Sequence, residues 1–153
     1  MKFLLSLLLF IPLLSFGAEV DTPQDISGPP LFLSSSNTAL SVPSSGNTVL
    51  LDLDVRKINR IFVIVTPTTN AFDAFIVQIN NHPSGTLQTI ASTAANYTAP
   101  AGIMVGASSD LTTLAAGATG WFILDTTGLY RVVVSASAAA AGAATVTAYA
   151  GGY

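Results

Sequence analysis

Apolar and polar residues alternate along several short segments of the chain. The segment 49–55 has one mainly polar face and one apolar face, formed by Val49, Leu51, Leu53 and Val55. The segment 72–80 alternates in the same way, with Phe75, Val77 and Ile79 on its apolar face. Because successive side chains of a strand point to opposite faces, both segments are predicted to be half-buried strands.

Residues 60–66 (RIFVIVT) are apolar on both faces and rich in β-branched residues, which predicts a central strand covered on both sides. Further strands are predicted at 87–91, 121–125, 130–136 and 143–150. Within the long stretch 92–119, the segments 103–105 and 111–114 are candidates for short strands. The alanine run 138–141 is too short for a stable helix and is interpreted as a turn or bulge.

Gly, Pro, Asn and Ser fall between these segments, and no amphipathic helix pattern is found. Short strands separated by regular turn signals are typical of antiparallel two-layer folds. We therefore expect an all-β fold, an antiparallel β-sandwich or jelly roll of about 8 strands, formed by a single domain over residues 31–153.

The N-terminal segment has the layout of a secretory signal peptide. Lys2 precedes an apolar run that ends at small residues near Gly17, and residues 1–17 are predicted to be removed. Residues 18–30 contain Pro, Gly and acidic residues and are expected to form a flexible leader. The run is shorter than the ~20 residues needed to span a bilayer, so no stable membrane insertion is expected after cleavage. The predicted location is exported: periplasmic, extracellular, or on a virion or cell surface.

The composition narrows the functional class. Hydrophobic residues make up 50% of the 153 residues, charged residues make up 8%, and there is no Cys. Thiol chemistry, disulfides and a Cys-based zinc site are therefore excluded. The few Lys and Arg residues argue against nucleic acid as a partner, because its binding rests on many phosphate contacts.

The chain resembles itself at an offset of 71 residues. Residues 43–63 align with 114–134, and the identical pairs include Asp54 with Asp125 and Arg60 with Arg131. Each copy reads as a strand ending in Asp, a short corner, and an Arg that begins the next strand. The alignment predicts a sandwich of two similar halves; chance similarity between amphipathic strand pairs is the alternative.

Asp54 with Arg60, and Asp125 with Arg131, could serve either of two roles. One role is a ligand-binding carboxylate and guanidinium. The other is a structural corner clasp, in which Asp accepts turn N–H groups and Arg pairs with it. We favour the structural clasp.

Residues suited to catalysis or metal binding are sparse. His82 lies in the turn sequence NNHPSG, and no Gly-x-Ser-x-Gly motif occurs. Asp52 and Asp54 share a strand face with Arg56, whereas a calcium site needs six to eight oxygen ligands. We predict that the protein is not an enzyme and has no catalytic residues, no metal site and no cofactor.

Two features favour binding or association instead. Trp121, Tyr130 and Tyr149 could form a binding surface for a glycan, although Trp121 and Phe122 point to opposite faces, so one of them is expected in the core.

The stretches 74–109 and 132–153 contain no charged residue. A surface of small uncharged side chains favours self-association or packing on a larger particle. Asn96-Tyr97-Thr98 also fits an N-glycosylation acceptor.

Three segments carry a family resemblance: LLDLDVRKINRIFVIVTP, DAFIVQINNHPSGTLQTIAS and LDTTGLYRVVVSASAAAAGAATVTAYAG. Over residues 39–151 the chain resembles small, uncharacterised β-sandwich virion-associated proteins of tailed phages and prophages. The resemblance implies a virion-associated or decoration-like role without catalysis and identifies no functional residue. The signal peptide departs from that pattern. Either the protein is a secreted or cell-surface relative, or its N-terminus is not a true signal.

The expected function is that of a non-enzymatic, exported structural or decoration-type β-sandwich. It would act by self-association or by association with a particle, including a phage or prophage virion. The alternative is a carbohydrate- or receptor-binding module on the cell surface or virion.

Overall fold

The computed structural model describes residues 33–93, 96–97, 102–108, 110–139 and 142–153. The predicted signal peptide and leader lie outside these residues. Within the described part, none of the helices is long and apolar enough to cross a membrane. The elements in chain order are β1 (Leu33–Val42), β2 (Thr48–Asp54), β3 (Arg60–Pro67), β4 (Phe72–Asn80), β5 (Gln88–Ala91), β6 (Met104–Ala107), a 3-10 helix η1 (Leu111–Thr113), β7 (Gly120–Asp125), β8 (Arg131–Ala138) and β9 (Ala144–Gly152).

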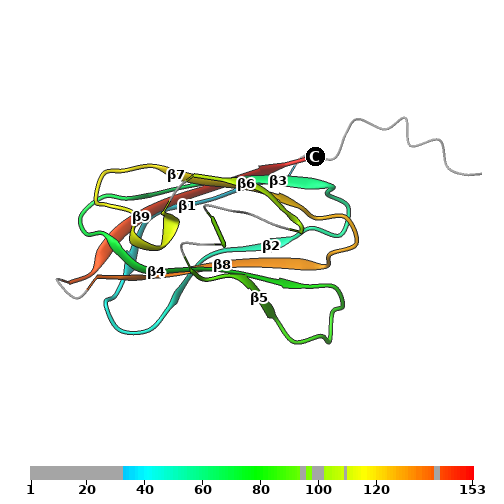
Figure 1. Cartoon of the computed structure of the whole chain (residues 1–153), viewed down its shortest axis with the longest axis horizontal. Coiled ribbons are helices and arrows are strands. Elements are labelled where there is room, and N and C mark those ends of the chain that lie inside the picture. The colour runs from blue at the N-terminus through cyan, green and yellow to red at the C-terminus, as the bar shows by residue number, and fades with distance from the viewer. Residues whose placement is uncertain (1–32, 94–95, 98–101, 109, 140–141) are drawn as a thin grey trace, which may run out of the picture.

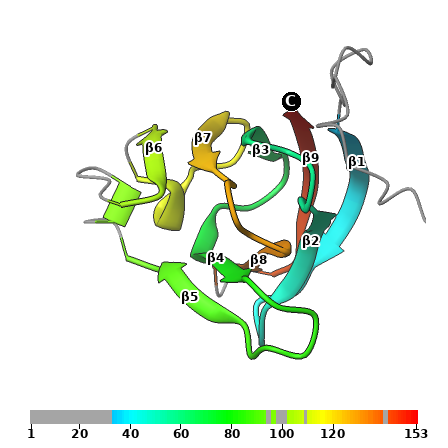
Figure 2. The ribbon, with the colours of Figure 1, turned by 90° about the vertical axis from the view of Figure 1, so that its right-hand side faces the viewer.

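The strands form two antiparallel sheets that pack face to face (Figure 1). One sheet has five strands in the order β1-β9-β3-β7-β6, and the other has four in the order β2-β8-β4-β5. Figure 2 shows the two layers from one end, with each sheet following its strand order across the view. The expected all-β antiparallel sandwich is confirmed, with nine strands in the described residues where about eight were expected.

The strand pairs reveal how the chain winds. β1 pairs with β9, β2 with β8, β3 with β7, and β4 with β5. These four pairs follow one another as a long two-stranded antiparallel ribbon, which is folded over on itself. Successive segments of this ribbon alternate between the two sheets, which is the jelly-roll arrangement. β6 is added beyond β7 at the edge of the five-stranded sheet.

The core between the sheets is built on aromatic rings. Phe75 contacts three of them, with ring centroids 5.7 Å from Phe72, 5.9 Å from Tyr97 and 6.1 Å from Phe122. All four side chains are buried. Burial of a large apolar side chain contributes about 1.5–3 kcal/mol, so this cluster is a main source of stability in a fold without disulfides.

The alternation predicted for residues 49–55 is wrong at its start. Val49 is 50% exposed, whereas Leu50 is buried. The pairing of β2 with β8 shifts between Val49 and Leu51, and this bulge turns Val49 to the outside. From Leu51 onward the predicted apolar face does point into the core.

The prediction that β3 is covered on both sides is also wrong. β3 lies in the middle of the five-stranded sheet, and its inward residues Ile61, Val63 and Val65 are fully buried. On the outer side, however, Phe62 is 41% exposed. The outer face of this sheet therefore displays apolar side chains.

Two further elements differ from expectation. β1 carries only a weak apolar pattern, LSSSNTALSV, and was not predicted as a strand. The predicted strand at 111–114 is wrong, because Leu111–Thr113 forms the 3-10 helix η1. A Cβ on Gly120 would clash with Leu111 Cδ2, so the absence of a side chain at Gly120 leaves the space that Leu111 fills. The predicted turn at 138–141 begins where β8 ends, and residues 140–141 lie outside the described residues.

Candidate functional site

Two corners of the chain lie against each other where the ribbon passes from one sheet to the other. The first corner joins β2 to β3, and the second joins β7 to β8. Asp54 is the cross-strand partner of Arg131, and Arg60 is the partner of Asp125. Between these pairs, the Val55 N–H donates to the Tyr130 carbonyl (3.1 Å), and the Thr126 N–H donates to the Asn59 carbonyl (2.9 Å).

These contacts repeat at the offset of 71 residues found in the sequence. The Ile58 N–H donates to the Val55 carbonyl at 3.0 Å, and the Leu129 N–H donates to the Thr126 carbonyl at 2.9 Å. Upstream of the two strands, Gly46 and Gly117 both have φ 76°. The two copies are therefore related by a local two-fold axis through the paired corners, and each Asp faces the Arg of the other copy.

The ion pairs at the corners differ from those predicted. Asp54 forms its ion pair with Arg56, at 2.5 Å, and not with Arg60. Arg131 forms its ion pair with Asp52, also at 2.5 Å, and not with Asp125. The physical reason is strand geometry: Asp54 and Arg60 belong to different sheets, whereas Asp52 and Arg131 lie on one face of adjacent strands.

The turn contacts expected of a clasp are present. The Arg56 N–H donates to Asp54 Oδ1 at 3.2 Å, and the Thr127 N–H donates to Asp125 Oδ1 at 2.9 Å. The pKa of Asp125 is lowered, first by the hydrogen bond from Thr127 and further by the charge of Arg60. That these residues act as structural clasps stays a prediction.

Positive charge is concentrated at this end of the sandwich. All Lys and Arg side chains of the described residues lie in or beside the corners: Arg56, Lys57, Arg60 and Arg131. The Arg56 guanidinium lies over the ring of Tyr130, 5.0 Å from its centroid. Tyr130 thus belongs to the corner and is held in a cation–π contact.

The other two aromatic residues of the predicted binding surface lie on the outer face of the five-stranded sheet. Ile64 on β3 is flanked by its cross-strand partners, Trp121 on β7 and Tyr149 on β9. Trp121 is 37% exposed and Tyr149 is 49% exposed, whereas Phe122 is fully buried, as the alternation predicts. The structure therefore brings Trp121 and Tyr149 to one face and places Tyr130 elsewhere.

Phe62 completes this aromatic face, and sequence reasoning missed it. Its ring centroid is 5.9 Å from that of Trp121, with the planes inclined by 39°. The signal was present in RIFVIVT, which is apolar on both sides, but a strand covered on both faces gives the same pattern. Only the position of β3 relative to the other elements separates the two cases.

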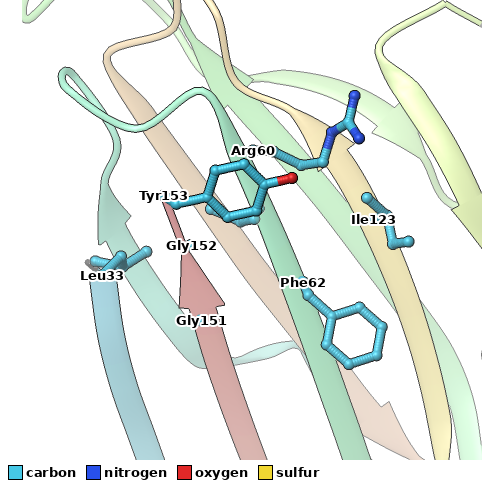
Figure 3. Close-up of a pocket in the computed structure, with 8 residues that line it drawn as sticks. Leu33, Arg60, Phe62, Ile123, Gly151, Gly152 and Tyr153 are labelled. Atoms are coloured by element: carbon cyan, nitrogen blue, oxygen red, sulfur yellow. The ribbon is translucent and has the colours of Figure 1, made fainter. Parts of the chain in front are cut away.

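Two adjoining grooves hollow this face beside Phe62. Figure 3 shows the residues that line the first of them. The first has a volume of about 410 Å³ and includes Leu33, Arg60, Ile123, Gly152 and Tyr153 in its walls. The second has a volume of about 310 Å³ and includes Ser34, Ser35, Ser36, Ile64 and Tyr149. Both share Phe62 and Gly151.

The remaining candidate residues serve local structure. His82 Nδ1 accepts a hydrogen bond from the Ser84 N–H at 3.1 Å, inside the turn after β4. Buried Asn80 holds the same turn by donating to the Gly85 carbonyl and accepting from the His82 N–H. Among the described residues, no three side chains of His, Asp or Glu gather where they could hold a metal ion.

The glycosylation motif is divided between an exposed and a buried residue. Asn96 is exposed, and its Oδ1 accepts hydrogen bonds from the N–H groups of Ser92 and Thr93. Tyr97 is fully buried, and its hydroxyl lies within hydrogen-bond distance of the carbonyls of Phe75 and Ala91. Thr98 lies outside the described residues.

No protein-family model and no curated protein match this chain. Among solved structures, the chain is similar to the SPBc2 prophage-derived protein YomS, with a TM-score of 0.48 and 12% sequence identity. The similarity covers 82% of this chain and 96% of that chain. The chain therefore has a distant resemblance to a prophage-derived protein.

Proposed function

We propose that this protein is a non-enzymatic, exported structural protein of the decoration type. It acts by associating with copies of itself or with a larger particle such as a phage or prophage virion. The predicted signal peptide supports export, and the sequence resemblance to virion-associated proteins supports the particle. The observation that carries the proposal is the uncharged row formed by Val49, Ser135 and Ile76 on the outer face of the four-stranded sheet.

The centre of this face lies on β8, whose outward side chains here are small or β-branched. Ser135 of β8 lies between its cross-strand partners Val49 of β2 and Ile76 of β4. In the next row along the sheet, Val133 lies between Asp52 of β2 and Gln78 of β4. Ser135 and Val133 are buried among these neighbours. The row of Val49, Ser135 and Ile76 is therefore uncharged, and these side chains lose few rotamers when another surface covers them.

Charge lies on both sides of this row. Asp52 and Arg131 neutralise each other at the corner end, and Asp73 lies at the opposite end, where β4 begins. Two copies related by a two-fold axis through this row would bring the uncharged residues of both copies together. Since the same patch must serve both partners in such a dimer, an uncharged centre suits this packing.

Size-exclusion chromatography with light scattering tests the proposal through two matched variants. Val49 and Val105 are exposed to 50% and 49% and lie on edge strands of opposite sheets. We expect Val49→Lys to reduce the wild-type oligomer or filament to a smaller species, because it puts a charge on the associating face. Val105→Lys is the control and keeps the wild-type size. Equal behaviour of the two variants contradicts the choice of face.

The alternative function, a carbohydrate- or receptor-binding module, concerns the opposite face of the sandwich. Its support is the aromatic groove on the five-stranded sheet. Association through one sheet leaves the other sheet accessible, so the two functions can coexist in one protein.

A further inference from the structure

We infer that the double groove on the outer face of the five-stranded sheet is an oligosaccharide-binding site. The inference rests on the alternative function, that of a carbohydrate-binding module, and it concerns the face opposite to the proposed association surface, so it does not depend on association. It rests on three observations about the groove: its glycine floor, its aromatic walls and its row of hydroxyl groups.

The floor of the groove is the outward position of β9 at Gly151. A Cβ built there meets nothing closer than the Leu33 carbonyl oxygen at 3.9 Å, and Gly151 is not among the glycines with positive φ. The backbone therefore does not require glycine at this position. The hollow exists because residue 151 has no side chain between its outward neighbours Tyr149 and Tyr153.

The adjacent glycine provides the contrast. A Cβ on Gly152 would lie 2.7 Å from the Arg60 carbonyl oxygen and 2.8 Å from Ile58 Cγ2, so close packing against β3 requires glycine there. Gly152 has a structural reason to be glycine, and Gly151 has none in the fold. The depression at Gly151 is therefore not a consequence of close strand packing.

The walls have the two kinds of surface that a sugar ring presents. A pyranose has an apolar face of C–H groups and a rim of hydroxyls. Figure 3 shows Phe62 and Leu33 on either side of the strand that carries Gly151, with the Tyr153 ring at the end of the groove. Tyr149 adds a further half-exposed ring next to the second hollow.

Hydrogen-bonding groups line the rim of the same grooves. Ser34 and Ser36 occupy outward positions of β1 along the second groove, and the Tyr153 hydroxyl and the Arg60 guanidinium lie at the first. Hydroxyls can both donate and accept, which matches sugar hydroxyls. Apolar walls with a few convergent polar groups and volumes of about 300 Å³ or more are typical of small-molecule sites.

Other occupants fit the groove less well. A second copy bound through a two-fold axis that passes through the groove would place one hollow against another hollow. A nucleic acid needs several phosphate contacts, whereas Arg60 is the one cation in the two walls. Neither wall contains a carboxylate for a metal ion. These residues therefore favour a largely neutral glycan chain.

The test uses the wild-type chain on an array of neutral and uronate-containing oligosaccharides. The best binder is then titrated in solution while Trp121 emission is followed. Trp121 is the one tryptophan of the chain and its ring neighbours Phe62, so it reports on ligands that contact this face. We expect Gly151→Val to weaken the affinity by about tenfold or more, because the valine fills the groove.

Two controls make the test specific. Gly106→Ala adds a side chain 3.6 Å from the Trp121 ring but outside both grooves, and should keep wild-type affinity. Val49→Lys lies on the opposite face and should also keep the affinity per chain, whatever its effect on oligomer size. The inference is overturned if the wild-type chain binds no oligosaccharide on the array. It is also overturned if Gly151→Val keeps the wild-type affinity and melting temperature.

Discussion

Asp54 and Arg131 are direct cross-strand partners at the paired corners, yet each forms its ion pair with a different residue. Asp54 pairs with Arg56 in the same corner. Arg131 of β8 pairs diagonally with Asp52 of the neighbouring strand β2. The corner is thus stabilised by two separate bidentate contacts, one local and one between strands. The two kinds of contact should respond differently to substitution.

The contact between strands should contribute to acid sensitivity. The Arg131 hydrogen bonds lower the pKa of Asp52 below its ordinary value, against a smaller opposing effect of burial. Because the folded-state pKa is the lower one, the contact stabilises the fold above about pH 4 and its contribution is lost as the pH falls through the folded-state value. Asp52→Asn should therefore lower the melting temperature at neutral pH and show a smaller further loss on acidification than wild type.

Thermal melts at neutral pH and at about pH 3 check this prediction. Asp73→Asn, at the opposite end of β4, serves as the control and should keep the wild-type difference between the two pH values. A wild-type acid response in Asp52→Asn would contradict the role of the contact. Arg131→Ala should reproduce the neutral-pH effect of Asp52→Asn, because either change removes the same pair.

The buried hydroxyl of Thr126 should be needed at the second corner. It donates to the Ile58 carbonyl at 2.5 Å, and Thr126 is 1% exposed. Thr126→Val keeps the shape but leaves that carbonyl without this donor, so the free energy of unfolding should fall by about 1–2 kcal/mol. Urea denaturation measures the change. Thr147→Val, on the outer part of β9, should stay close to wild type.

The Tyr97 hydroxyl should fasten the segment after β5 to the core. It lies 2.9 Å from the Phe75 carbonyl oxygen and 3.2 Å from that of Ala91. Tyr97→Phe preserves the aromatic packing and should cost about 1–2 kcal/mol of stability through the lost hydrogen bond. Tyr149→Phe removes a hydroxyl from a half-exposed ring and should cost nothing measurable in the same denaturation experiment. Equal effects would show that the Tyr97 hydroxyl is not the relevant group.

Adjacent glycines near the end of β9 should respond in opposite ways. Gly152→Ala forces a Cβ against the Arg60 carbonyl and should destabilise the fold by about 1–3 kcal/mol. Gly151→Ala meets open space and should leave the free energy of unfolding unchanged or raise it by up to about 1 kcal/mol. Calorimetric melting of the two variants provides the comparison. Destabilisation by both would mean that Gly151 has a structural role.

The sequence predicts where the strands lie better than it predicts which of their faces are buried and which strands are neighbours. Alternation located most strands because a core between two sheets imposes a period of two on each of them. It missed β1, whose serines lie at an edge, and it misplaced Val49, because a bulge moves one residue to the other face without any mark in the local pattern.

The binding surface was only half predictable for a related reason. Trp121 and Tyr149 are polar-tipped aromatics and stand out in the sequence, whereas Phe62 has the same apolar character whether it faces the core or solvent. The ion pair of Arg131 with Asp52 depends on which strands become neighbours, because these residues are 79 apart in the sequence and meet only through the pairing of β2 with β8. Such partners follow from topology, which the period of a single strand does not contain.

Association of the protein is tested by measuring the molar mass of the wild-type chain over a range of concentrations. Light scattering after size-exclusion chromatography gives this mass without reference to shape. We expect a defined oligomer or a filament, or a monomer that co-purifies with a larger particle. A strictly monomeric protein at high concentration, with no particle bound, would contradict it.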